Sequence, residues 1–580
     1  MLRRKFVGAV LVVAFLMPST ALVYGQGEYI APKADIDRIK DEGLNRSQVM
    51  KTLSFMTDVI GPRLTGSPGL KRANDWTRDT LTSYGLQNSH LESWGPFGRG
   101  WTLKRFTAMV NGPAAFPLIA YPKAWSPGTN TLFAAPIVDP KAKKPKTPVP
   151  AADPSTAYTS DVVNFNPQSE AELEQFKGKL KGKIVLVGAI RELKAEFEPQ
   201  GTRRNETNLL DLANAPDPNA PRVAGAGPGP NAGNFQQQFQ FAARRFRFLH
   251  EEGAAVLIDT AFKGDGGTIF VQGAQAVQAA PPAPGGTPTP NVPVRDKNAV
   301  VPIQLVATPE HFNRMARMIS AGEKVSMTVD IAVEFQDTDP NAYNTIAEIP
   351  GTDKADEVVM LGGHLDSWHG ATGATDNGAG CAVMMEAVRI IQALGLKPRR
   401  TIRIALWSGE EQGLLGSRAY VKQHFGYRGD GTTPSFGGGG GGQNAAAQAL
   451  TKLPAYEKLS AYFNIDNGTG KIRGVHMQGN EKARPLFRNW LAPFKDMGAN
   501  TLTIANTGGT DHLAFDAIGL PGFQFIQDEV EYSSRTHHSN MDSFDRIQAD
   551  DMKQMSIILA AFVYQTAMMD ERFPRKDVPQ

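Results

Sequence analysis

The sequence of 580 residues contains a single cysteine, Cys381. One cysteine cannot form an internal disulfide, so the stability of this chain must come from core size and from any metal that it binds. Cys381 lies within an apolar helical pattern, which favours a small buried core residue over a nucleophile.

The N-terminal apolar run is too short to span a membrane. It covers 12 residues, 6–17, whereas a spanning helix needs about 20. Three basic residues precede the run, and Val23 and Gly25 suit a cleavage site before Gln26. The pattern predicts a secretory signal peptide over residues 1–25 and a secreted or periplasmic protein, with an uncleaved anchor as the alternative.

The mature chain also lacks an excess of positive charge. The formal net charge is +3, and residues 1–25 hold three basic and no acidic residues, so their removal leaves a net charge of zero. This balance excludes a general basic surface for nucleic acid. No nucleic acid and, after signal cleavage, no membrane is expected as a partner.

The length of the chain exceeds what one hydrophobic core usually supports, so more than one domain is expected. Proline- and glycine-rich stretches separate short strand patterns between about residues 124 and 336. We predict one catalytic domain in two parts, 26–130 and 336–575, with a small β-rich domain inserted at 131–335. The glycine-rich segment 435–450 is predicted to be a flexible loop, with a substrate lid as the alternative.

From residue 344 onward, strand patterns alternate with helical patterns. Short apolar runs predict strands at residues 358–361, 401–407, 461–465 and 522–526. The segment that follows Asp376 has helical spacing and closes at Gly395. This alternation predicts an α/β fold, a three-layer αβα domain with a mostly parallel sheet covered on both faces.

Residues with ligand chemistry follow several of these predicted strands. The stretch VVMLGGHLDSWHGATGATD, residues 358–376, leads from an apolar strand into a loop that carries His364, Asp366 and Asp376. Open α/β sheets bind ligands at the carboxyl ends of their strands. Each such residue alone is more often a solvated turn or a surface histidine, but their coincidence at successive strand ends favours a functional site.

Acidic residues follow the next two predicted strands as well. Glu410 and Glu411 come after the second strand, and Asp466 comes after the third. Two adjacent carboxylates are costly when buried without a partner, and a nearby cation would remove that cost. Two imidazoles and four carboxylates suit a borderline divalent metal, zinc first, and the number of carboxylates favours two ions.

These motifs resemble, in order and spacing, the co-catalytic zinc exopeptidases of clan MH, a family that includes bacterial leucyl aminopeptidases and glutamate carboxypeptidase. The resemblance is carried by HLDSW, TGATDNGAG, SGEEQGLLGS, the Asp466-Asn467-Gly468 turn, GGTDHLAF and HHSNMD. HLDSW, the LGLKPRRT link and the double histidine are most similar to the carboxypeptidase Q branch. The insert resembles a protease-associated domain.

The resemblance implies two zinc ions, with other divalent metals as an alternative. The implied ligands are His364, Asp376, Glu411, Asp466 and His538. Asp376 would bridge the two ions, His364 and Asp466 would complete one site, and Glu411 and His538 would complete the other.

The resemblance also implies roles around the metals. Glu410 would be the general base that deprotonates the attacking water and then protonates the leaving amine. Asp366 would orient a ligating imidazole. His537 would line the substrate pocket, and Asp511 and His512 would either face the cleft or pack in the core.

The expected activity is hydrolysis of dipeptides or short peptides, from a free amino terminus. No arginine cluster could be assigned to a substrate carboxylate, which favours aminopeptidase or dipeptidase action, with carboxypeptidase action as the alternative. A glutaminyl cyclase of the same fold and a non-catalytic binding protein are the rival classes. The small pattern Gly378-Ala379-Gly380 and the insert argue against the cyclase. The sequence does not determine the oligomeric state, and a homodimer is one of the options that it leaves open.

Overall fold

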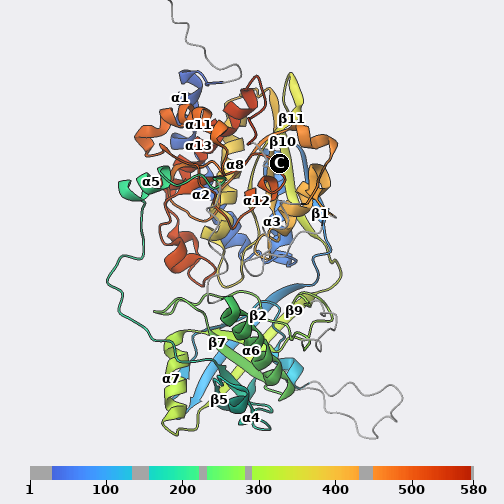
Figure 1. The fold of residues 1–580 in the computed structure, drawn as a ribbon, viewed down its shortest axis with the longest axis vertical. Helices are drawn as coiled ribbons and strands as arrows, with labels where there is room; N and C mark the ends of the chain where they lie inside the picture. Colours follow the sequence, from blue (N-terminus) through green and yellow to red (C-terminus); the bar gives the residue numbers. More distant parts are fainter. Residues whose placement is uncertain are drawn as a thin grey trace, which may run out of the picture.

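The computed structural model describes residues 29–133, 156–220, 232–280, 291–429, 431 and 448–576. The predicted signal peptide and most of the glycine-rich segment lie outside these residues. The described elements build two parts, each around its own eight-stranded sheet. Figure 1 shows them one above the other, with β10 and β11 in the upper part and β2 and β9 in the lower.

The first sheet is mostly parallel at its centre. Its strands, in spatial order, are β1 (Gln87–Trp94), β10 (Ala342–Ile349), β12 (Arg400–Trp407), β11 (Lys354–His364), β15 (Leu459–Asn464), β18 (Gly522–Gln527), β16 (Ile472–His476) and β17 (Thr501–Thr503). The neighbours β12, β11, β15 and β18 are parallel, whereas β1 and β10 run antiparallel to their neighbours. The strand β16 is antiparallel to β18 and parallel to β17. All four predicted strands and the α/β class are therefore confirmed.

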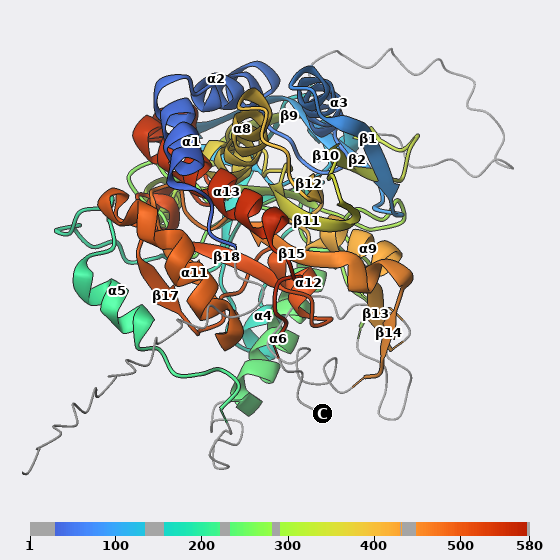
Figure 2. The ribbon, with the colours of Figure 1, turned by 90° about the horizontal axis from the view of Figure 1, so that it is seen from above.

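Helices cover both faces of this sheet, as the alternating pattern predicts. The helices of the first face are α1 (Lys33–Asn45), α2 (Val49–Ser54), α8 (Ala379–Ala393), α11 (Arg484–Leu491) and α13 (Ala549–Met568). The other face carries α9 (Leu415–His424) and α12 (His512–Asp516). In Figure 2, α1, α2 and α8 lie on one side of β11 and α9 on the other. The helix α3 (Pro68–Ser83) packs on β1 and β10.

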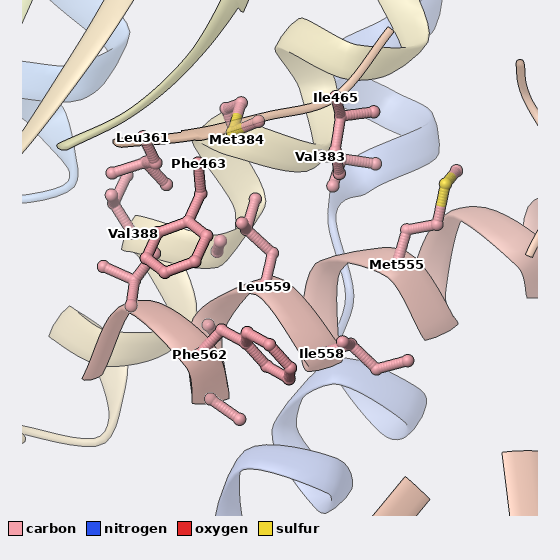
Figure 3. Close-up of a cluster of buried hydrophobic side chains, with 14 of the residues drawn as sticks. Leu361, Val383, Met384, Val388, Phe463, Ile465, Met555, Ile558, Leu559 and Phe562 are labelled. Carbon is pink, nitrogen blue, oxygen red and sulfur yellow. The ribbon is translucent and has the colours of Figure 1, made fainter. Parts of the chain in front are cut away.

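The largest core lies between the sheet and the pair α8 and α13. Leu361 and Phe463 point from the strands towards Val388 and Phe562 of the helices (Figure 3). Each of these side chains is fully buried, and burial of one such side chain is worth about 1.5–3 kcal/mol. This core fixes β11, whose last residue enters the candidate site.

The second sheet has its own core and a mixed topology. Its strands, in spatial order, are β3 (Phe116–Pro117), β2 (Gly100–Gly112), β9 (Ser326–Gln336), β5 (Tyr158–Phe165), β6 (Ile184–Val187), β7 (Val256–Thr260), β8 (Ile303–Ala307) and β4 (Ala120–Pro122). Its helices are α4 (Glu170–Glu174), α6 (Ala232–Glu251) and α7 (Pro309–Ser320). Four of its strands, β5 to β8, are parallel neighbours.

The predicted start of the inserted domain at residue 131 is too late. The second sheet begins at Gly100, because β2 pairs antiparallel with β9 along nearly its whole length. Local sequence patterns do not reveal this pairing, because β2 and β9 lie more than 200 residues apart. We use "inserted domain" below for the part built on this second sheet.

Three further elements lie at the edges of the first part. They are the helix α5 (Glu206–Ala213) and the hairpin strands β13 (Gly426–Arg428) and β14 (Leu450–Lys452). Among the described residues, no helix has the length and apolar character needed to cross a membrane.

Candidate metal centre

The predicted ligands converge at the carboxyl edge of the first sheet. His364 is the last residue of β11, and Asp466 follows β15 by two residues. Glu410 and Glu411 follow β12, which is the other neighbour of β11. Because β12, β11 and β15 are parallel, their carboxyl ends meet at one edge. Asp376 approaches the same edge from a short turn, Ala374–Gly378, at the start of α8.

The imidazole of His364 faces three carboxylates. Its Nε2 lies 3.2 Å from Asp376 Oδ1, 3.6 Å from Asp466 Oδ2 and 4.0 Å from Glu410 Oε2. The ring is almost completely buried, with 1% of the side chain exposed. These distances place His364, Asp376 and Asp466 as one set of donors, with Glu410 further from the ring.

The imidazole of His538 faces the other side of Asp376. Its Nε2 lies 3.1 Å from Asp376 Oδ2 and 2.9 Å from Glu411 Oε2. Asp376 therefore presents one carboxylate oxygen to each imidazole, and the two donor sets share this residue. The peptide bond between Asp376 and Asn377 is cis.

Several buried atoms of this cluster that could act as metal ligands lack a hydrogen-bond partner. They are His364 Nε2, Asp376 Oδ2 and Glu411 Oε1. A single ligand atom from each of these three residues fits within 4.8 Å of the others. Buried polar atoms are normally hydrogen-bonded, and buried charges are paired or bind metal. The chemistry and arrangement of these donors thus fit a divalent cation.

The protonation of the cluster is strongly perturbed. Burial raises the pKa of Glu410 well above its usual range, although His364 opposes the effect. Burial and the Asp376 carboxylate raise the pKa of Glu411 to about 7. Burial disfavours the charged form of His538, but Glu411 and Asp376 outweigh it and raise its pKa to about 10. Without metal, the site therefore balances its acids with protons, which a divalent cation would replace.

Asp366 organises the turn that carries the two glutamates. Its carboxylate accepts hydrogen bonds from the backbone N–H groups of Glu410 (3.2 Å) and Glu411 (3.3 Å) and from the hydroxyl of Thr65 (2.9 Å). The Nδ1 of His364 lies 3.0 Å from the backbone carbonyl of Asp366 and 3.6 Å from its carboxylate. The nearer partner of this imidazole is thus the backbone of Asp366.

Sequence reasoning missed Asp542, which holds the turn of Asp376. Its carboxylate accepts the backbone N–H groups of Thr375 (2.5 Å) and Asp376 (3.1 Å). Burial and the Asp376 carboxylate raise the pKa of Asp542 to about 7. The motif HHSNMD ends on this residue, so an acid four residues beyond His538 was the available signal.

The three predicted pocket residues differ in their surroundings. His537 Nε2 lies 3.8 Å from Asp376 Oδ2, and burial lowers the pKa of His537 to about 4. Asp511 is completely buried, and burial raises its pKa to about 7. The Nε2 of His512 lies 3.1 Å from the carbonyl of Thr507, which turns this ring towards a loop backbone.

The inserted domain reaches the site. The side-chain amide of its Gln272 lies 2.7 Å from His538 Nδ1, and the backbone N–H of Val271 donates to the His538 carbonyl at 2.8 Å. Trp368, in the HLDSW motif, packs edge-on against both Trp125 and His538. A small pocket beside the cluster is lined by Trp368, Ala371, Gly373, Asp376, His538, Ser539 and Asp542. Sequence reasoning assigned no role to Gln272 or Trp368.

An αβα core with imidazole and carboxylate donors gathered at the carboxyl edge of its sheet fits the class of metal-dependent hydrolases. Residues 344–563 match the model of peptidase family M28. The segment contains all five predicted ligands and Glu410. The resemblance inferred from the motifs is confirmed at the level of the family.

Two curated proteins and one solved structure illustrate the similarity. Carboxypeptidase Q of Mus musculus is 30% identical over 269 residues, 46% of this chain and 50% of that protein. Leupeptin-inactivating enzyme 1 of Streptomyces exfoliatus is 29% identical over 270 residues, 44% of this chain and 54% of that protein. The chain thus spans about half the length of the curated relatives that it matches.

The solved structure extends the likeness in fold. It is the crystal structure of a peptidase M28 precursor from Shewanella amazonensis SB2B, with a TM-score of 0.59 and 21% identity. The match covers 94% of this chain and 99% of that one. The two chains therefore share a fold over nearly their whole lengths.

Proposed function

We propose that this protein is a zinc-dependent exopeptidase that cleaves dipeptides or short peptides. One observation carries the proposal: the carboxylate of Asp376 lies between two imidazoles, with one oxygen 3.2 Å from His364 Nε2 and the other 3.1 Å from His538 Nε2. Each imidazole has a further carboxylate beside it, Asp466 or Glu411. A shared carboxylate between two donor sets is the arrangement that co-catalytic metal sites need.

Zinc is the metal that the donor set favours. In the proposal, Asp376 would contribute to both of two ion positions, with His364 and Asp466 holding one ion and Glu411 and His538 holding the other. Imidazole and carboxylate donors suit zinc among the common divalent cations. Bound there, the metals would supply Lewis acidity that polarises the scissile carbonyl and lowers the pKa of water to about 7.

Glu410 is the proposed general base. Its Oε2 is further from His364 than the oxygens of Asp376 and Asp466, so its carboxylate is the one left free when the ligands are assigned. Its backbone is fixed by Asp366, which holds the side chain at the edge of the cluster. Glu410 would take a proton from the attacking water and deliver it to the leaving amine nitrogen.

A free substrate amine is the proposed anchor. Glu410, Asp376 and the buried Asp511 make this edge of the sheet strongly acidic. Burial of an ammonium group is favourable only where acids or a metal pair with it. We expect the zinc-loaded protein to hydrolyse free dipeptides and to lose that activity when the substrate amine is acetylated. Equal cleavage of acetylated and free substrates would reject amine anchoring.

A second candidate is recognition of the substrate carboxylate by Lys263. The ammonium of Lys263 donates to the Ser533 carbonyl at 2.9 Å and lies 4.1 Å from the centre of the Phe270 ring. Burial lowers the pKa of Lys263, and the negative charge of the Asp376 carboxylate opposes this effect. The similarity to carboxypeptidase Q also favours this alternative.

A panel of blocked dipeptides separates the two candidates. The substrates are one free dipeptide, its N-acetyl form and its C-terminal amide, each tested with the wild type and with Lys263→Met. If the N-acetyl form is the only substrate that is not cleaved, the enzyme is an aminopeptidase. If the C-terminal amide is the only substrate that is not cleaved, it is a carboxypeptidase. If neither blocked form is cleaved, it is a dipeptidase. If Lys263 binds the carboxylate, Lys263→Met should raise KM for the free dipeptide and leave KM for the amide unchanged.

A further inference from the structure

A short segment of the inserted domain pairs with the loop that carries His538. Phe270 forms a β-bridge with Ser539. The backbone N–H of Val271 donates to the His538 carbonyl, and the backbone N–H of Asn540 donates to the Ile269 carbonyl at 3.0 Å. Residues 269–272 and 538–540 therefore form a small antiparallel contact between the two domains.

This contact holds the backbone of His538 in an uncommon conformation. The φ angle of His538 is +60°, in the left-handed region that residues other than glycine rarely adopt. Such conformations persist where the surrounding structure fixes them, and they concentrate at functional sites. The direction of the His538 ring thus depends on its pairing with the inserted domain.

The chemistry of the ring demands a particular partner at Nδ1. The Nε2 of His538 faces Asp376 and Glu411, so it can bind a cation only when its lone pair is free. In a neutral imidazole the proton must then sit on Nδ1, which becomes a donor and needs an acceptor. The side-chain amide nitrogen of Gln272, Nε2, lies 2.7 Å from Nδ1 in the amide orientation drawn.

The amide of Gln272 can supply that acceptor. Its oxygen and nitrogen are nearly equal in size, and a half-turn of the amide exchanges them without moving any other group. The other imidazole shows the same requirement, because His364 Nδ1 lies 3.0 Å from the carbonyl oxygen of Asp366. Both imidazoles therefore have a carbonyl-type partner, but His364 finds it in its own domain and His538 finds it in the inserted domain.

We propose that Gln272 is a positioning residue: with its amide flipped from the drawn orientation, Oε1 accepts a hydrogen bond from the Nδ1–H of His538 and leaves the His538 Nε2 lone pair free to bind metal. The inserted domain thereby completes the metal position formed by Glu411 and His538, whereas the position formed by His364 and Asp466 is complete without it. This inference rests on the metal-binding part of the proposed function. It assigns to the inserted domain a direct effect on metal affinity.

The test is zinc affinity of the full-length protein, measured by competition with a chromophoric chelator after metal removal. We expect the wild type to bind two zinc ions. Gln272→Ala should weaken one of them about 10- to 100-fold, the range found when the partner of a ligating histidine is lost. Gln272→Glu, which keeps an acceptor oxygen, should bind at least as tightly as the wild type.

Asn540→Ala provides the matched control. Asn540 holds the same domain contact, because its side chain accepts the Ile269 N–H at 2.7 Å and donates to the Gly267 carbonyl at 3.1 Å. It does not bond to the His538 ring, so both zinc affinities should stay within about threefold of the wild type. An equal loss in Asn540→Ala and Gln272→Ala would show that the contact as a whole matters and would overturn the specific role of Gln272.

The outcomes also separate this inference from the proposed function. Two tight zinc ions in both the wild type and Gln272→Ala would overturn the role of Gln272 and leave the metallopeptidase proposal standing. Absence of zinc binding by the wild type would overturn both. Thermal unfolding of the metal-free variants should match the wild type within about 2 °C, so that a loss of affinity in Gln272→Ala reports on the ring and not on folding.

Discussion

Replacement of Glu410 by glutamine tests whether Glu410 is the general base and the adjacent Glu411 is the metal ligand. General-base catalysis contributes about 10²–10⁴ in rate, so Glu410→Gln should lower kcat by at least that factor. This factor corresponds to an increase in the activation free energy of about 3–5 kcal/mol. Zinc content should stay near the wild-type value, because Glu410 Oε2 is the most distant of the three carboxylate oxygens around His364 Nε2.

The structure indicates that this change is local. Glutamine has nearly the same shape as glutamate, and the backbone of residue 410 is held by Asp366 independently of its side chain. Burial raises the pKa of Glu410 well above its usual range, so ionisation of this group costs stability as the pH rises. A neutral amide removes that cost, and metal-free Glu410→Gln should unfold at a temperature no lower than the wild type at pH 8.

The assay combines steady-state hydrolysis of a free dipeptide with measurement of bound zinc. Glu411→Gln is the matched control, since the same chemical change one residue along removes an oxygen 2.9 Å from His538 Nε2. The control should lose one zinc ion. Should Glu410→Gln lose zinc while Glu411→Gln keeps both ions, the roles of the two residues are reversed.

Three further changes test the rest of the site. Asp376→Ala should lose both zinc ions and lower Tm more than any other ligand change, because its carboxylate serves both donor sets; retention of one tight zinc by metal analysis would contradict bridging. Asp542→Ala leaves the N–H groups of Thr375 and Asp376 without an acceptor and should lower the free energy of unfolding by about 1–3 kcal/mol in urea titration; an unchanged midpoint would argue against this role. In the presence of a chelator, Tm should fall as the pH rises from 5 to 9. The pKa values of Glu411 (about 7) and His538 (about 10) lie above their values in the unfolded chain, so proton binding stabilises the folded state, and this stabilisation is lost as the protons leave. Zinc should reduce that fall, and a rise of Tm over the same range would refute the assignment.

The strands that position the site could be predicted because they are buried on both faces. A parallel strand between two helical layers is a continuous apolar run, and residues 358–361 and 401–407 show it plainly. Once these strands are neighbours and parallel, the residues after them must meet at one edge. His364, Glu410 and Glu411 were therefore predictable as a group from local patterns alone.

The residues that complete the site depend on contacts between distant parts of the chain. Gln272 and His538 are separated by 266 positions, and no local periodicity connects them. The first strands of the second sheet were missed for the same reason, since β2 pairs with β9, a strand more than 200 residues further along the chain. Asp542 accepts hydrogen bonds from backbone N–H groups, which every residue type except proline offers, so the sequence does not identify its partners.

The two metal positions differ in what holds their ligands. His364 and Asp466 extend from strands whose side chains are buried in the main core. His538 lies on a loop that the inserted domain holds at its start, where Thr202 and Val530 exchange backbone hydrogen bonds of 2.8 and 2.9 Å, and again at residues 538–540. Displacement of the inserted domain should therefore disturb the position of His538 before that of His364. The inserted domain is thus coupled to one metal position through the loop that it contacts.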